Sequence, residues 1–123
     1  MDQPTPTNRG KPIRHGDFDT LCDALDYAAL CKTGFNFFDG RAKLKESLTY
    51  SELRVKALAL AKRLVPFATK NSRIGLAAVS TPEFAIIFMA CQYAGLVPAP
   101  LPLPVTLGGR NSQKMARKKS LQK

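Results

Sequence analysis

The sequence is poor in the residues from which catalytic and metal sites are usually built. Its 123 residues include one histidine, His15, and three cysteines that are scattered instead of forming a C-x-x-C motif. One histidine and three distant cysteines do not have the spacing of metal ligands, so we expect no metal site. Isolated cysteines without a disulfide framework favour a reduced, cytoplasmic protein.

Long apolar runs are also missing. The stretch of lowest polarity, residues 84–107, is interrupted by Gln92, Gly95 and four prolines, which argues against a transmembrane helix. The first six residues lack the apolar core of a secretory signal. Residues 1–18 hold three prolines, two glycines and mixed charge, and therefore predict a flexible leader.

Positive charge is in excess but unevenly distributed. The formal net charge is +10, and residues 108–123 contain six basic and no acidic side chains. We therefore predict a basic disordered tail at 108–123. Such a tail can be merely solvated, or it can bind an acidic protein, an anionic membrane surface or a phosphate backbone. It contains no aromatic side chain for stacking on bases, which argues against nucleic acid as the partner.

The first half of the body predicts a helix followed by a β-hairpin. Thr20 is the expected N-cap of a helix with Asp23 in its first turn, and Gly34 lies just beyond the expected end of that helix. Residues 35–39 and 46–48 are expected to form two strands, joined by a polar turn.

A second helix has the clearest start signal in the chain. Thr49 and Glu52 have the spacing of a capping box, in which each side chain binds the other residue's backbone N–H. Leu48 and Leu53 flank the box as a hydrophobic staple. Pro66 is expected to stop this helix.

The following residues predict one right-handed βαβ unit, with strands at 73–79 and 96–101 around an apolar helix at 84–94. Such a parallel pair is normally buried on both faces, so the fold class is α/β but incomplete. Ser80 and Thr81 precede the helix and could cap it or bind an anion. The lack of a glycine-rich loop favours capping.

Four prolines alternate with other residues at positions 98, 100, 102 and 104. One interpretation is a polyproline ligand for an aromatic groove. Their spacing at every second residue, in a segment that directly follows a strand, instead favours a rigid edge strand and an exit loop.

Three motifs together resemble the N-terminal part of the adenylate-forming acyl ligases, the acyl-CoA synthetase and AMP-binding superfamily. They are L-T-Y-S-E-L at 48–53, S-T-P-E-F at 80–84 and Y-A-G-L-V-P-A-P-L at 93–101. The continuation L-P-L-P and the sequence G-G-R at 108–110 are most similar to the fatty-acyl-AMP ligase branch. The resemblance covers roughly residues 20–112, and it implies that 19–107 form part of the large subdomain of an adenylating enzyme.

The resemblance implies an enzyme that uses ATP and Mg²⁺ to convert a fatty acid to an acyl-adenylate, for transfer to an acyl-carrier protein or coenzyme A. The phosphate loop with its lysine, the nucleotide-contacting motifs and the domain with the catalytic lysine have no match in this sequence. No catalytic, cofactor-binding or metal-binding residue is therefore assigned, and ATP and Mg²⁺ are expected only for the full-length family.

Three functional hypotheses follow. The chain could be a truncated or frame-shifted part of such a ligase, inactive alone and completed by the remainder. It could be one half of a split enzyme, completed by a separate chain. It could also be a free-standing module that docks on an acidic partner through its basic tail. Under the first hypothesis, an exposed sheet edge and uncovered helix faces predict poor solubility or a need for partners.

Overall fold

The computed structural model describes residues 11, 14 and 16–103, and it confirms an α/β arrangement in the predicted order. The elements are α1 (Leu21–Ala28), β1 (Gly34–Phe38), β2 (Leu44–Thr49), α2 (Tyr50–Leu64), a 3₁₀ turn η1 (Val65–Phe67), β3 (Arg73–Ala77), α3 (Pro82–Tyr93) and β4 (Val97–Leu101). The predicted basic tail and most of the predicted leader lie outside the described residues.

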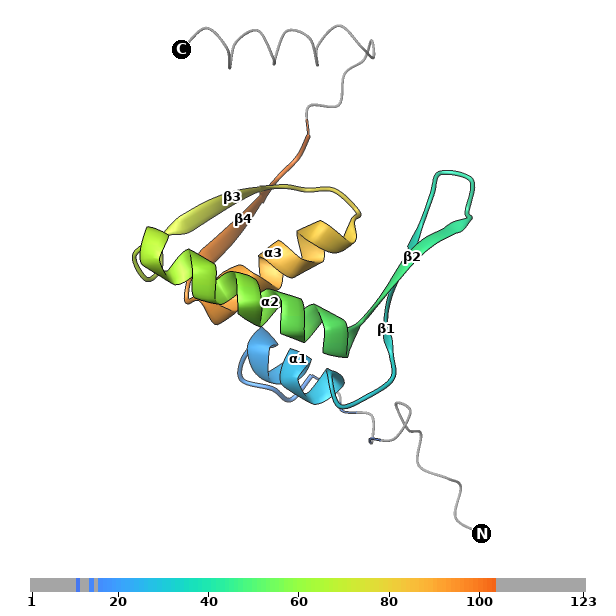
Figure 1. Cartoon of the computed structure of the whole chain (residues 1–123), viewed down its shortest axis with the longest axis horizontal. Helices are drawn as coiled ribbons and strands as arrows, with labels where there is room; N and C mark the ends of the chain where they lie inside the picture. The colour runs from blue at the N-terminus through green and yellow to red at the C-terminus, as the bar shows by residue number, and fades with distance from the viewer. Residues whose placement is uncertain (1–10, 12–13, 15, 104–123) are drawn as a thin grey trace, which may run out of the picture.

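The helices α2 and α3 pack against each other at the centre of the molecule (Figure 1). The helix α1 contacts both of them on one side, and the strands β3 and β4 contact α3 on the other, while the β1–β2 hairpin projects outward. One core cluster of buried side chains joins the hairpin base to the helices: Leu25, Leu48, Leu53, Ala57, Ala61, Met89 and Ala90. No helix in the described part of the chain is long and apolar enough to cross a membrane.

The predicted helix starts are confirmed at atomic detail. Thr20 Oγ1 accepts a hydrogen bond from the backbone N–H of Asp23 at 3.1 Å. The capping box at the start of α2 is complete: Thr49 Oγ1 accepts from the Glu52 N–H at 3.1 Å, and Glu52 Oε2 accepts from the Thr49 N–H at 3.0 Å. Leu48 and Leu53, the two halves of the staple, are both buried, and Pro66 lies in η1 directly after α2.

The first helix ends earlier than the position of Gly34 had led us to expect. It ends at Ala28, and residues 29–31 form turns in which the Leu30 and Cys31 N–H groups bind the carbonyls of Tyr27 and Ala28. Gly34 instead begins β1 and pairs with Thr49. A Cβ atom at position 34 would overlap the Leu48 and Thr49 backbone, so this position requires glycine for close approach of the strands.

The returning strand of the hairpin begins earlier than the predicted residue 46. An Asp39 oxygen accepts hydrogen bonds from the N–H groups of Arg41 at 2.8 Å and Lys43 at 3.0 Å. Ala42 has a φ of 59°, so the chain reverses within these few residues. Pairing therefore resumes at Leu44, opposite Phe38.

The βαβ prediction is confirmed by the parallel pairing of β3 with β4, in a register from Arg73↔Val97 to Ala77↔Leu101. Between them, α3 ends before Gly95, which has a φ of 73°. The first strand is shorter than predicted because the Val79 N–H binds the Ala77 carbonyl and turns the chain toward α3.

Candidate functional site

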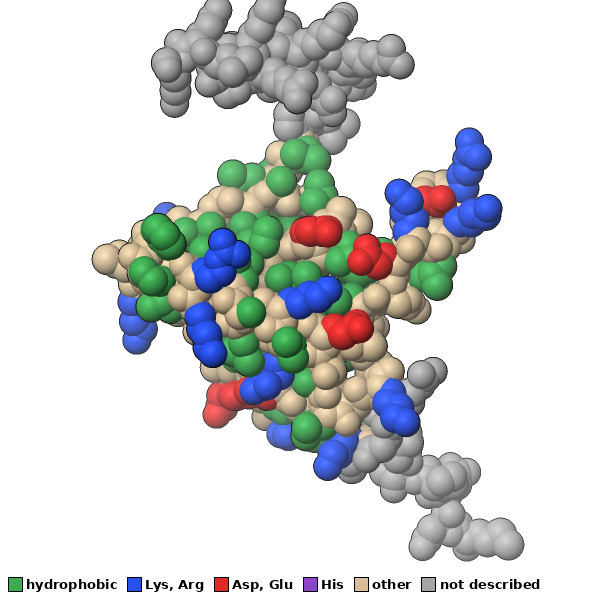
Figure 2. All heavy atoms as spheres, viewed as in Figure 1, with side chains coloured by type: hydrophobic (Ala, Val, Ile, Leu, Met, Phe, Trp, Pro, Cys, Tyr) green, Lys and Arg blue, Asp and Glu red, His purple; other side chains and the backbone are tan. Residues whose placement is uncertain are grey.

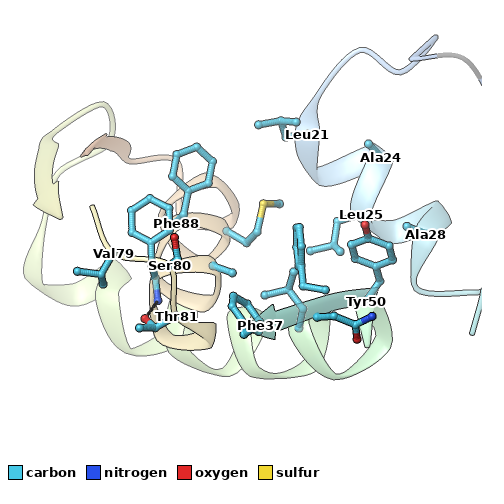
Figure 3. Close-up of a pocket in the computed structure, with 16 residues that line it drawn as sticks. Leu21, Ala24, Leu25, Ala28, Phe37, Tyr50, Val79, Ser80, Thr81 and Phe88 are labelled. Atoms are coloured by element: carbon cyan, nitrogen blue, oxygen red, sulfur yellow. Dashed lines mark hydrogen bonds between the residues drawn. The ribbon is translucent and has the colours of Figure 1, made fainter. Parts of the chain in front are cut away.

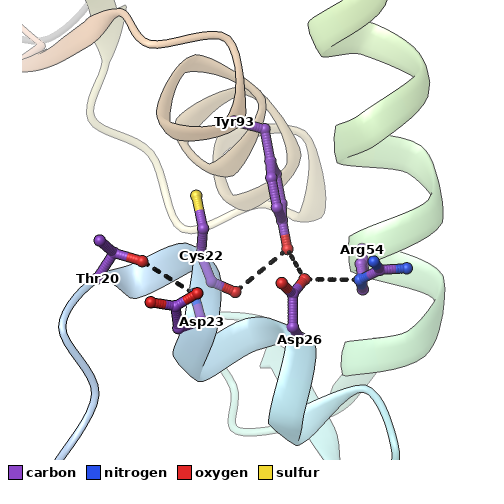
Figure 4. Close-up of polar contacts among 6 residues, drawn as sticks. All are labelled: Thr20, Cys22, Asp23, Asp26, Arg54 and Tyr93. Carbon is purple, nitrogen blue, oxygen red and sulfur yellow. Dashed lines mark hydrogen bonds and ion pairs between the residues drawn. The ribbon is translucent and has the colours of Figure 1, made fainter.

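A polar cluster of Asp26, Arg54 and Tyr93 joins the three helices (Figure 4). Tyr93 Oη on α3 donates a hydrogen bond to Asp26 Oδ1 on α1 at 2.6 Å and lies 3.4 Å from the Cys22 carbonyl oxygen. Arg54 Nε on α2 donates to the same Asp26 oxygen at 2.7 Å. The carboxylate thus accepts one bond from each of the other two helices.

The charge states of this cluster favour a structural role over proton transfer. Desolvation opposes the charge of Asp26, but hydrogen bonds from Tyr93 and Arg54 outweigh it, so the pKa of Asp26 lies below its usual value. Desolvation and the bond to Asp26 raise the pKa of Tyr93 well above its usual value. Asp26 therefore stays ionised and Tyr93 stays neutral at neutral pH. Neither side chain has a pKa close to neutral pH, as a general acid or base requires.

The cysteines do not form a nucleophilic or metal site. All three are free thiols, with Cys31 and Cys91 buried and Cys22 half-buried. Burial raises the pKa of Cys22 and of Cys91, which lowers the fraction of reactive thiolate. Among residues 11, 14 and 16–103, no group of three or more His, Cys, Asp or Glu side chains could hold a metal ion.

The start of α3 is capped by its own residues. Thr81 Oγ1 accepts a hydrogen bond from the Phe84 N–H at 3.3 Å, and Pro82 occupies the first turn. The capping alternative for Ser80 and Thr81 is thereby confirmed. Thr81 uses its side chain within the helix terminus, while Ser80 is exposed.

An apolar pocket of about 700 Å³ lies between α1, β1, α2 and α3 (Figure 3). Its walls include Leu21 and Leu25 of α1, Phe37 of β1, and Phe84 and Phe88 of α3. The described residues that line it include no Asp, Glu, His, Lys or Arg. The pocket can therefore accept apolar groups, but it offers no charged group to hold a phosphate or to transfer a proton.

The outer end of the β1–β2 hairpin carries basic side chains, visible as a blue group set apart from the body in Figure 2. Arg41, Lys43 and Lys45 are exposed there, with Glu46 close by in sequence and the Asp39 carboxylate engaged in the turn. This mixture of charges is typical of a solvated hairpin tip.

Comparison with protein families identifies the chain. The family model described as "AMP-binding enzyme" matches residues 26–116, about three quarters of the sequence. The chain belongs to the AMP-binding enzyme family. The resemblance inferred from the motifs is thus confirmed.

Individual relatives agree with this assignment. A Caulobacter vibrioides protein named as an acyl-CoA synthetase is 45% identical over 109 residues, which cover 88% of this chain and 19% of the relative. The medium-chain-fatty-acid–[acyl-carrier-protein] ligase JamA of Moorena producens is 35% identical over 96 residues, covering 74% of this chain and 16% of JamA. A solved structure from a study of fatty acyl-adenylate ligases of E. coli and L. pneumophila is 46% identical, with a TM-score of 0.76 over 90% of this chain and 20% of that one.

The chain therefore spans about a fifth of the length of the proteins it matches. Its described residues also do not fit the ATP and Mg²⁺ that the family implies. The pocket has no charged lining, and the start of α3 is capped internally by Thr81. The described ranges also contain no group of three or more His, Cys, Asp or Glu side chains that could hold a metal ion.

The cluster of Asp26, Arg54 and Tyr93 was not predicted from the sequence. Asp26 and Tyr93 are 67 residues apart, and Asp26 and Arg54 are 28 apart, so no local spacing links them. Only knowledge of how α1 crosses α2 and α3 could have indicated the contact.

Proposed function

We propose that this chain is the opening part of the adenylating domain of a ligase that activates fatty acids with ATP. The similarity to a fatty acyl-adenylate ligase structure, at 46% identity over 90% of the chain, carries this proposal. In the complete enzyme the fatty-acid carboxylate would attack the α-phosphate of ATP and release pyrophosphate. The acyl group would then pass to an acyl-carrier protein, the acceptor in the name of JamA, or to coenzyme A.

The part played by residues 20–103 in that enzyme is architectural. The polar cluster clamps three helices together, β3 and β4 begin a parallel sheet, and the apolar pocket offers a surface for the rest of the domain. The pocket has no charged lining, and the Asp26 and Arg54 charges of the polar cluster pair with each other, so we propose that the chain alone does not form acyl-adenylate. Three free thiols support a reducing, cytoplasmic location.

A chimeric ligase tests this function directly. The matching 109-residue segment of the Caulobacter vibrioides relative is replaced by the corresponding segment of this chain, and ATP–pyrophosphate exchange is measured with medium-chain fatty acids. We expect exchange from the chimera, and none above blank from the 123-residue chain or from the relative lacking its segment. A folded but inactive chimera would contradict the architectural proposal, and exchange by the isolated chain would contradict its inactivity.

A further inference from the structure

Positive charge is uncompensated along the stretch that runs from α2 to the start of α3. Residues 53–82 contain six basic side chains and no acidic one. Arg54 is paired with Asp26 of α1. The other five basic side chains are exposed: Lys56, Lys62, Arg63, Lys70 and Arg73.

Three of these side chains lie on the outer face of α2. The helical repeat places Lys56, Lys62 and Arg63 on one side, together with the exposed Val55. The opposite side of the helix is buried, at Leu53, Ala57 and Ala61. Glu52 is the acidic residue of α2, but it stands in the first turn and closes the capping box. Positive charge therefore collects toward the end of α2 that leads into η1.

An uncovered apolar group stands at the same end. Phe67 of η1 is 87% exposed, more than any other large hydrophobic side chain in the described ranges, and Val65 is 57% exposed. Favourable interaction with the helix dipole explains basic residues in the last turn of α2, but it does not explain a phenylalanine left in water. In Figure 2, green and blue side chains gather over the η1 end of α2, and red ones lie toward its other end. We call this surface the α2–η1 face, made of Lys56, Lys62, Arg63, Val65 and Phe67.

The form of the α2–η1 face favours a lipid surface as its partner. Phe67 projects from the protein and lines neither of the two pockets described for the chain. A folded protein would need a matching cavity for this side chain, whereas acyl chains adapt to any apolar shape. The neighbouring lysine and arginine side chains are long enough to keep their charges in water beside an inserted apolar group. Anionic lipid headgroups attract such charges.

We propose that the α2–η1 face docks on an anionic lipid surface. Val65 and Phe67 enter the boundary between the headgroups and the acyl chains. Lys56, Lys62 and Arg63 lie at the level of the lipid phosphates. The docking does not rest on the proposed ligase activity, because every residue that carries it belongs to this chain.

Flotation of the 123-residue chain with vesicles tests the docking. The vesicles contain equal parts of phosphatidylcholine and phosphatidylserine. We expect Phe67→Ala to weaken binding at least about tenfold, because the apolar side chain that enters the bilayer is lost. We expect the double variant Lys62→Gln and Arg63→Gln to weaken binding about 25-fold, which is about fivefold for each charge removed. Vesicles of phosphatidylcholine alone should bind the wild-type chain more weakly than the mixed vesicles.

The β1–β2 hairpin supplies matched controls. Phe38 is 58% exposed there, and Lys43 and Lys45 are exposed basic residues. Phe38→Ala, and the double variant Lys43→Gln and Lys45→Gln, should leave vesicle binding unchanged. Losses in the hairpin variants as large as those in the α2–η1 variants overturn the inference. Undiminished binding by the α2–η1 variants also overturns it, because the six basic side chains of residues 108–123 would then be sufficient.

Fluorescence shows whether position 67 enters the lipid. The sequence contains no tryptophan, so Phe67→Trp and Phe38→Trp each introduce a single reporter. With the mixed vesicles we expect a blue shift for Phe67→Trp, and quenching of its emission by lipids with brominated acyl chains. We expect neither effect for Phe38→Trp. A fluorophore at position 67 that stays in water overturns the inference.

Two further outcomes would assign the α2–η1 face to another partner and overturn the inference. Soluble polyglutamate that binds as tightly as the vesicles, with no loss for Phe67→Ala, would indicate an acidic protein. An active chimeric ligase that does not bind the vesicles would show that the remainder of the ligase covers this face. In that second case the proposed function stands, since the exchange activity of the chimera is measured separately.

Discussion

Tyr93 Oη lies 2.6 Å from Asp26 Oδ1, although 67 residues separate the two in the chain. This contact fastens α1 to α3, and Arg54 extends it to α2 by binding the same carboxylate oxygen at 2.7 Å. The helix α1 has only eight residues and buries a single side chain, Leu25. The cluster therefore adds one polar bond between this short helix and each of its two neighbouring helices.

Removing the tyrosine hydroxyl should loosen α1. We expect Tyr93→Phe to lower the free energy of unfolding by about 1–2 kcal/mol, because Asp26 loses a charge-assisted hydrogen bond. Urea denaturation followed by circular dichroism measures the change. The variant Tyr50→Phe, which removes a tyrosine hydroxyl outside the cluster, serves as the control. Equal stability of Tyr93→Phe and wild type would show that the contact contributes nothing.

Acid should weaken the same cluster. The folded-state pKa of Asp26 lies below its ordinary value of 3.8, so the folded protein binds this proton less tightly than the unfolded chain does. The resulting stabilisation is complete above the unfolded pKa and is lost as the pH falls through the folded pKa. Between about pH 5 and pH 3, wild type should lose more stability than Asp26→Asn does. Parallel pH profiles for the two proteins would be inconsistent with this assignment.

The parts of the fold that could be predicted from the sequence are those determined by residues close to one another in the chain. Thr49 and Glu52 stand three residues apart, and their capping box requires only that spacing. The alternate prolines of β4 likewise marked an edge strand, since a missing N–H is a property of the residue itself. The parallel pairing of β3 with β4 followed from the single helix between them.

The parts that were missed depend on distant partners. Gly34 was interpreted as lying just beyond the end of a helix, but its role is to let the backbone of Leu48 approach, which only the paired hairpin reveals. The contact of Tyr93 with Asp26 was not predicted, because nothing near Tyr93 in the sequence indicates Asp26. The apolar pocket was also not predicted, since residues from four separate elements line it.

The capping box should contribute measurably to stability. Thr49→Ala removes the acceptor for the Glu52 N–H, and we expect the free energy of unfolding to fall by about 1 kcal/mol. Ser51→Ala is a matched control, because it changes an exposed hydroxyl two residues further along α2. Thermal denaturation of the two variants side by side gives the comparison. A loss as large for Ser51→Ala would argue that general helix propensity, and not the cap, is responsible.

Two glycines of the hairpin should differ in their response to the same substitution. A Cβ at Gly34 would overlap the backbone of Leu48 and Thr49, which cannot move aside without breaking the pairing of β1 with β2. A Cβ at Gly40 would meet no atom within 4 Å. We therefore expect Gly34→Ala to destabilise the protein by about 2 kcal/mol or more, and Gly40→Ala to change stability by less than about 0.5 kcal/mol. Urea denaturation gives both values, and NMR cross-strand contacts between Phe35 and Leu48 show whether the strands separate. If Gly34→Ala keeps those contacts and wild-type stability, the close approach of the two strands is not what requires glycine at this position.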